Sequence, residues 1–273
     1  MKLGVSIRLM GAAATREIVA ECARAADAAG LDDLWVPDHI AIPPDDAEGS
    51  GGRYLDPLAS LAWLAGITEH IGLGTGVLIL PYRAPLPTAK WIATIQELSG
   101  GRMRLGVGIG WMKAEFRALG VPRSGRGRIA DATLDLLHRC FAAEDDVVVE
   151  HEQPFLFRPR PARPPIFIGG AGDHALARTI RHGDGWMPMI GDPGRLADEI
   201  RRLHEMAEQA GRPAPEVVSF GAIATDDPGR GAEQLRALSR IGVTRVVAGR
   251  RYDDAREFRR LVDGLVAVRE AAA

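Results

Sequence analysis

The side chains that could move protons in this chain are few and stand at the ends of apolar runs. Asp38 and His39 follow the apolar run 34–36, and Glu115 lies about one helical turn beyond Trp111, which ends another run. Histidine titrates near neutral pH, so His39 can accept or donate a proton at little cost. A core histidine is the alternative for His39, and an ion pair with an arginine is the alternative for Glu115. We predict His39 and Glu115 as the catalytic residues.

The other residue types favour a bound cofactor over a protein nucleophile. No histidine, cysteine or carboxylate residues have the spacing of metal ligands, and no serine or cysteine stands with a base as a nucleophile. Many glycines and two tryptophans, Trp111 and Trp186, could instead line a large planar ligand. Such a wall suits a cofactor that carries the reaction chemistry itself. We therefore predict a cofactor site and no metal site.

A glycine-rich segment is the candidate loop for the phosphate of this cofactor. Gly169, Gly170, Ala171 and Gly172 lead into a predicted helix over residues 173–181. The free N–H groups and the positive dipole end of a helix N-terminus attract phosphate. Loops between strands and helices are also glycine-rich for close packing, which is the alternative.

Strands must position these residues, and the stretch 71–111 shows how. Two almost continuous apolar runs flank a segment with helical spacing, which is the pattern of a βαβ unit whose strands are buried on both faces. Glycines stand toward the end of each run, at Gly74, Gly76, Gly108 and Gly110. Such glycines either pack tightly inside a barrel or let a flat ligand approach the backbone.

The same rhythm continues along the chain and predicts about eight strands alternating with about eight helices. Outside the stretch described above, the predicted strands cover residues 3–9, 34–36, 165–170, 186–189, 217–223 and 243–248. We predict an α/β fold, a (β/α)8 TIM barrel forming one domain over 1–273, with the active site at the C-terminal ends of its strands. An insertion at about 112–164, between strands 4 and 5, contains a hairpin. An open doubly wound sheet is the alternative, but no G-x-G-x-x-G turn follows the first strand.

Composition and charge argue against several classes of protein. The chain has 273 residues, a formal net charge of −2 and no basic stripe, so nucleic-acid binding has no electrostatic support. No stretch approaches the length of a membrane span. Cys22 and Cys140 lack metal spacing, which indicates a reduced, cytoplasmic protein. The segment 41–53, rich in proline and glycine, is a candidate lid over the site.

Six segments together resemble the luciferase-like monooxygenase superfamily, in particular its single-domain members that use the 5-deazaflavin coenzyme F420. They extend over most of the chain to about residue 190. The remainder matches the family only in its alternation of predicted strands and helices. The segments are 34–39, 72–78, 85–111, 115–120, 165–170 and 182–186.

The resemblance implies a cofactor ring lying across the ends of the barrel strands. It implies a non-prolyl cis peptide between Gly76 and Val77, behind the middle of that ring. It places Asp38 and His39 beside the ring and the loop 169–172 at the cofactor phosphate.

Further contacts complete the predicted cofactor site. Gly110 and Trp111 are predicted to line it, and Arg126 and Arg128 could meet the acidic tail of the coenzyme. The resemblance also favours a homodimer.

The activity that the resemblance implies is hydride transfer between F420 and an unidentified small organic substrate, with His39 as the proton partner and Glu115 as a second acid or base. One alternative is an FMN-dependent monooxygenase that uses reduced flavin and O2. Another is a non-catalytic barrel that binds the cofactor.

Two positions depart from family members that oxidise a sugar phosphate. Those members have a tryptophan shortly after the histidine, where this chain has 42–44, and a glutamate where it has Trp111. The departures argue against a sugar phosphate and indicate a more apolar substrate space.

Overall fold

The computed structural model describes residues 1–142, 146–190 and 192–273. Within these ranges, parallel strands pair in the order β3-β2-β1-β11-β10-β9-β8-β5-β4, and an additional pairing of β3 with β5 closes the barrel. Because β3 and β4 both pair with β5, they form one barrel strand interrupted at residues 76–77. The predicted (β/α)8 barrel is therefore confirmed. The barrel strands are β1 (Lys2–Ser6), β2 (Asp33–Val36), β3 (Gly72–Thr75), β4 (Leu78–Ile79), β5 (Met103–Gly108), β8 (Ile166–Gly169), β9 (Gly185–Met187), β10 (Glu216–Gly221) and β11 (Arg245–Ala248).

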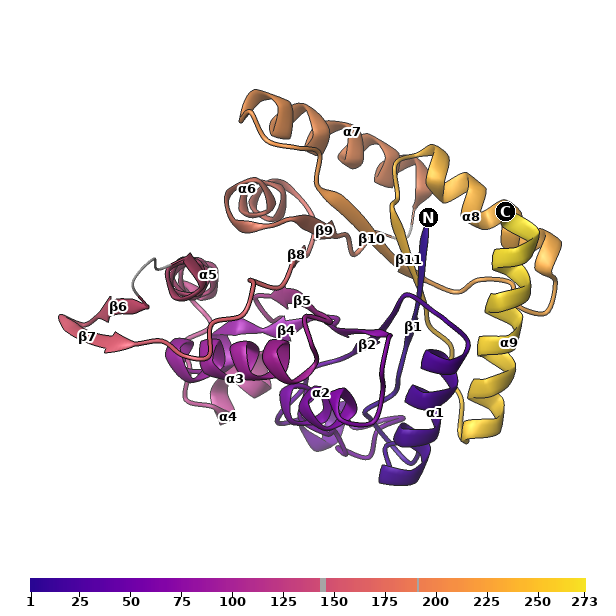
Figure 1. Cartoon of the computed structure of the whole chain (residues 1–273), viewed down its shortest axis with the longest axis horizontal. Coiled ribbons are helices and arrows are strands. Elements are labelled where there is room, and N and C mark those ends of the chain that lie inside the picture. The colour runs from indigo at the N-terminus through magenta and orange to yellow at the C-terminus, as the bar shows by residue number, and fades with distance from the viewer. Residues whose placement is uncertain (143–145, 191) are drawn as a thin grey trace.

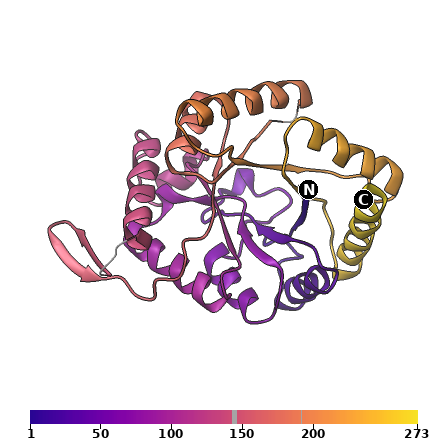
Figure 2. The same ribbon diagram turned by 45° about the horizontal axis from the view of Figure 1, so that its top comes forward.

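The helices form a ring around these strands (Figure 2). Several begin at side-chain caps, since Thr15 and Asp56 accept hydrogen bonds from the first turns of α1 and α2. A short helix, α4 (Lys113–Ala118), follows β5 outside the ring's regular alternation. The ring consists of α1 (Arg16–Ala28), α2 (Pro57–Ala65), α3 (Pro85–Leu98), α5 (Arg126–Ala142), α6 (Asp173–His182), α7 (Pro193–Gln209), α8 (Pro228–Arg240) and α9 (Ala255–Ala272).

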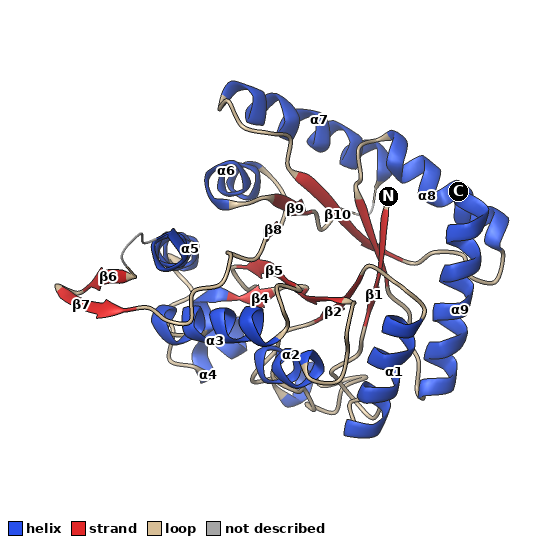
Figure 3. Ribbon diagram, in the orientation of Figure 1, coloured by secondary structure: helices blue, strands red, loops and turns tan. Residues whose placement is uncertain are grey.

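The predicted insertion between β5 and β8 divides into a barrel helix and an added hairpin. Helix α5 packs against α3 and α6, so it is the barrel's own helix after β5. Strands β6 (Val147–Glu150) and β7 (Gln153–Leu156) form the predicted antiparallel hairpin, which projects away from the ring of helices (Figures 1 and 3). Residues 143–145 of the predicted insertion lie outside the described residues.

The barrel interior is filled in layers. An ionic cluster occupies the N-terminal ends of the strands, where Arg245 pairs with Asp33 and with Glu216. Above it lies an apolar layer, with Val77 and Phe220 packed against it; its buried members are Trp35, Phe167, Met187, Val218 and Val247. The interior is thus a packed core, as in other TIM barrels, whose ligands bind at the C-terminal mouth.

Two further predictions concern membrane-spanning helices and the state of the two cysteines. Among the residues that the structure describes, no helix is long and apolar enough to cross a membrane. Both cysteines are buried thiols, and burial raises the pKa of Cys22 to about 12 and that of Cys140 to about 11. Neither thiol is therefore an activated nucleophile.

Candidate active site

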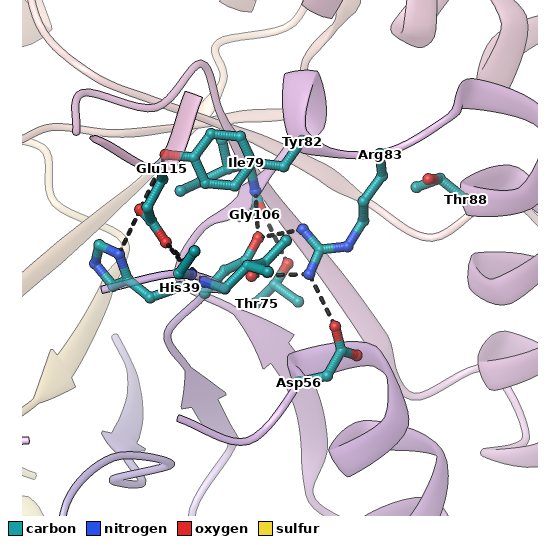
Figure 4. Close-up of polar contacts among 12 residues, drawn as sticks. His39, Asp56, Thr75, Ile79, Tyr82, Arg83, Thr88, Gly106 and Glu115 are labelled. Atoms are coloured by element: carbon teal, nitrogen blue, oxygen red, sulfur yellow. Dashed lines mark hydrogen bonds and ion pairs between the residues drawn. The ribbon is translucent and has the colours of Figure 1, made fainter. Parts of the chain in front are cut away.

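A histidine–glutamate pair lies where β2 and β5 end. His39 follows β2, and its Nδ1 lies 2.9 Å from Oε2 of Glu115, which projects from α4 (Figure 4). The His39 side chain is 18% exposed, whereas that of Glu115 is fully buried. Since Nδ1 faces Glu115, Nε2 is the ring nitrogen left for a ligand in the mouth.

Glu115 is held as an anion by four hydrogen-bond partners. Its Oε1 accepts hydrogen bonds from the backbone N–H groups of Ile40 at 2.7 Å and Ala41 at 3.0 Å. Its Oε2 accepts one from the hydroxyl of Tyr82 at 3.0 Å, besides facing His39. Burial alone would raise the pKa of Glu115, but these hydrogen bonds and His39 outweigh it, and the net direction is downward. An ionised carboxylate cannot donate a proton, so the geometry favours a role in orienting His39.

Asp38 does not point into the mouth. Its buried carboxylate accepts two hydrogen bonds from Arg83, at 2.6 and 2.8 Å, and one from the N–H of Ile79 at 2.8 Å. Burial lowers the pKa of Arg83, but its hydrogen bonds to Asp38 and Asp56 outweigh that effect and the net direction is upward. Asp38 therefore fixes β4 and the segment after it relative to β2.

The floor of the mouth is built around Val77. The Gly76–Val77 peptide is cis, as the resemblance implied. The Val77 side chain fills the space that side chains at Gly108 and Gly169 would need, because a Cβ atom at those positions would lie 2.6 and 2.8 Å from Val77 methyl carbons. A Cβ at Gly76 would lie 2.7 Å from the ring of Phe220. These glycines pack side chains rather than a ligand, which was the alternative interpretation from the sequence.

The glycine loop between β8 and α6 has a defined conformation. Gly170 has φ +123° and donates its N–H to the carbonyl of Met187, while its own carbonyl accepts a hydrogen bond from the indole of Trp186. Trp186 is fully buried, so it supports this loop and does not line the mouth as expected. Ala171 is exposed at the surface of the loop.

The loop ends at Gly172, the N-cap of α6. Gly172 has φ +77°, and a Cβ there would meet no atom within 4 Å. Among the described residues, no side chain at the N-cap position accepts a hydrogen bond from the first turn of the helix. Backbone N–H groups at a helix N-terminus can bind a phosphate, so Gly172 and the first turn of α6 fit the phosphate of a cofactor.

Aromatic rings flank His39 on the side of the mouth. The ring centroid of Tyr54 lies 5.1 Å from that of His39, and the centroid of Trp111 lies 6.3 Å from it. Tyr54 directly follows the candidate lid. The end of the lid is fixed by two contacts of Arg53. Its carbonyl accepts a hydrogen bond from the N–H of Gly11, and its guanidinium donates to the carbonyl of Ala14.

The remaining predicted residues lie apart from His39. Gly110 has φ +73°, and a Cβ there would meet Ile79 and Phe116, so it serves the turn into α4. Arg126 begins α5 and is half-buried with an unpartnered Nε, whereas Arg128 is exposed.

Sequence reasoning missed Tyr54, Tyr82 and Arg83. A signal existed for Tyr82 and Arg83, because both directly follow the third barrel strand, at the end of the barrel where the site lies. Tyr54 carried no signal, since only the path of a long loop brings it to His39.

A barrel of this topology, with a buried carboxylate orienting a histidine at its mouth, defines a candidate enzyme of the TIM-barrel class. A family model described as luciferase-like monooxygenase matches residues 4–270. The chain therefore belongs to the luciferase-like monooxygenase family, as the sequence resemblance indicated.

Two relatives illustrate the similarity in sequence. An uncharacterized protein of Mycobacterium tuberculosis is 30% identical over 249 residues, which are 83% of this chain and 83% of that protein. The F420-dependent hydroxymycolic acid dehydrogenase of the same organism is 31% identical over 178 residues, which are 62% of this chain and 48% of that protein.

Two solved structures share the fold. An F420-dependent secondary alcohol dehydrogenase in complex with an F420-acetone adduct superposes with a TM-score of 0.81 at 17% identity, covering 100% of this chain and 99% of that one. The oxygenating constituent of 3,6-diketocamphane monooxygenase from Pseudomonas putida, in complex with FMN, superposes with a TM-score of 0.78 at 13% identity, covering 97% of each chain. Of these two structures of the same fold, one thus holds an F420 adduct and the other FMN.

Proposed function

We propose that this chain is an F420-dependent oxidoreductase that transfers hydride between the deazaflavin and a small organic substrate. The observation that carries the proposal is His39, oriented by a buried carboxylate at the mouth of the family's barrel. A relative whose name states F420 dependence supports the choice of cofactor. A homodimeric, cytoplasmic enzyme without a nucleic-acid partner completes the proposal.

The residues that would hold the cofactor are those of the floor and the glycine loop. Val77 would support the ring, and the N–H groups at Gly172 and the start of α6 would bind the phosphate. Arg126 and Arg128 would meet the acidic tail. When bound, the deazaflavin supplies a carbon that donates or accepts a hydride.

His39 would manage the proton that accompanies this hydride. Reducing a carbonyl group leaves its oxygen needing a proton, and oxidising an alcohol releases one. With Glu115 accepting from Nδ1–H, Nε2 of neutral His39 carries a lone pair that can accept the alcohol proton. The protonated ring can return that proton in the reverse direction.

Side-by-side titration of the purified chain with F420 and with FMN tests the cofactor. We expect binding of F420 and bleaching of the oxidised deazaflavin absorbance when a substrate donates hydride. Tight binding of FMN without binding of F420 would instead identify the FMN-dependent monooxygenase.

The His39→Ala variant tests the catalytic role. We expect turnover to fall by about 10²- to 10⁴-fold, the usual contribution of a general acid or base, with cofactor affinity retained. A non-catalytic carrier would bind F420 and show no turnover with any substrate in the wild-type chain.

A further inference from the structure

The rim of the mouth beside His39 exposes large apolar side chains. Trp111 is 66% exposed and Ile40 is 45% exposed, and they lie three and four residues after β5 and β2, the strands that end at the site. Across the barrel, beyond β9, Met189 is 78% exposed. Large apolar side chains that gather at a binding site and stay uncovered mark the surface that a ligand covers.

Trp111 is placed to contact whatever His39 contacts. Its ring meets the His39 ring edge-on at 6.3 Å between centroids, with an interplanar angle of 84°. Tyr54 flanks the same imidazole at 5.1 Å. These two rings are therefore the aromatic surfaces nearest to a substrate whose reacting oxygen reaches His39.

The rings around His39 have no cationic partner among the described residues. In the part of the chain that the structure describes, no lysine or arginine contacts His39, Tyr54 or Trp111 through a hydrogen bond, an ion pair or a cation–π interaction. The guanidinium of Arg53, beside Tyr54 in the sequence, is held by the carbonyl of Ala14. A phosphate or carboxylate beside the reacting carbon would lose its hydration without gaining a partner there.

We propose that the substrate is an uncharged alcohol or carbonyl compound whose apolar body packs on the Trp111–Ile40 rim. This inference rests on the proposed function and names its substrate class. Trp111 acts as the specificity-determining residue, with Tyr54 as a second aromatic contact beside His39.

Binding of straight-chain 2-alkanones to the chain loaded with oxidised F420 tests this inference by calorimetry. The oxidised cofactor has no hydride to give a ketone, so the complex forms without turnover. Each added methylene group that packs on the rim raises affinity by up to about fourfold, so 2-octanone binds more tightly than 2-butanone. Glucose 6-phosphate serves as the charged comparison and binds more weakly than 2-octanone.

The Trp111→Ala variant assigns the effect to the rim, with Trp91→Ala as its matched control. Trp91 is also exposed, at 46%, but lies on the outer helix α3. We expect Trp111→Ala to abolish the dependence on chain length, and Trp91→Ala to leave both that dependence and the affinity for F420 unchanged.

Three results would overturn the inference. They are tighter binding of glucose 6-phosphate than of 2-octanone, affinity independent of chain length in the wild-type chain, and loss of F420 affinity in Trp111→Ala, which would assign that ring to the cofactor. Failure of the wild-type chain to bind F420 at all would contradict the proposed function instead, and calorimetry with F420 alone separates the two failures.

Discussion

We infer that Glu115 affects the proposed proton transfer by orienting His39. A variant that removes the charge of Glu115 tests this role. In Glu115→Gln the amide oxygen still accepts from Ile40 and Ala41, which turns the NH2 group toward Nδ1 of His39. That nitrogen must then accept a hydrogen bond, so the ring proton moves to Nε2. We expect turnover to fall by about 10- to 100-fold, as for other residues that orient a reacting group, with a changed pH–rate profile and unchanged F420 affinity.

Tyr82→Phe is the matched control at the same carboxylate. It removes one hydrogen bond to Glu115 and leaves the charge facing His39, at a cost of about 1 kcal/mol in the free energy of unfolding. Its pH–rate profile should match that of the wild-type chain. Wild-type turnover and an unchanged profile in Glu115→Gln would show that Glu115 does not orient the histidine.

The same carboxylate makes stability depend on pH. In the folded chain the pKa of Glu115 lies below its ordinary value of 4.5, because its hydrogen bonds outweigh the effect of burial. The stabilisation is therefore complete above that ordinary value and is lost as pH falls through the folded-state pKa. We expect the wild-type chain to exceed Glu115→Gln by about 1–3 kcal/mol in the free energy of unfolding near neutral pH. Urea denaturation at acidic pH should show a smaller difference, and a constant difference would contradict this assignment.

At the scale of the elements, the floor of the mouth depends on strands β3, β5 and β8 fitting together around Val77. A methyl group at Gly108 would lie 2.6 Å from Val77 Cγ2 and must displace it. We expect Gly108→Ala to lower the free energy of unfolding by about 1–3 kcal/mol, the usual cost of overpacking a core, as measured by urea denaturation. Because Val77 forms the floor, cofactor affinity should fall as well.

A double substitution separates this clash from a general cost of losing a strand glycine. Val77→Ala removes the methyl groups that Gly108→Ala meets, so the two changes together should cost less than their sum. Gly221→Ala on β10 is the neutral control, because a Cβ there meets no atom within 4 Å. Additive costs in the double variant would mean that Val77 does not limit the space at Gly108.

The sequence predicted the elements better than the contacts between them. The hairpin predicted in the insertion is present as β6 and β7, because a hairpin forms between residues close together in the sequence. The hydrogen bonds of Glu115 join residues 33 and 75 positions away, at Tyr82 and Ile40, and only closure of the barrel brings them together. Position at a strand end therefore identified His39 and Glu115, but not their pairing or the outward turn of Asp38.

On the scale of the whole molecule, the two ends of the barrel have different tasks. The N-terminal end holds a buried ionic cluster, in which Arg245 is 1% exposed and pairs with Asp33, the first residue of β2, and Glu216, the first of β10. Arg104 adds a second cation at 3.4 Å from Asp33. Residues at this end of a TIM barrel serve stability, whereas those at the mouth serve chemistry.

Arg245→Met tests this division. It leaves the Asp33 carboxylate buried beside Arg104 alone, and breaking a buried pair costs about 3–5 kcal/mol in the free energy of unfolding. Arg256→Met, at an exposed position on α9, is the control and should change that free energy by less than about 0.5 kcal/mol. Because the cluster lies at the opposite end of the strands from Val77 and His39, F420 affinity measured well below the unfolding transition should equal that of the wild-type chain. A parallel loss of F420 affinity would show that the layers of the barrel interior couple its base to its mouth.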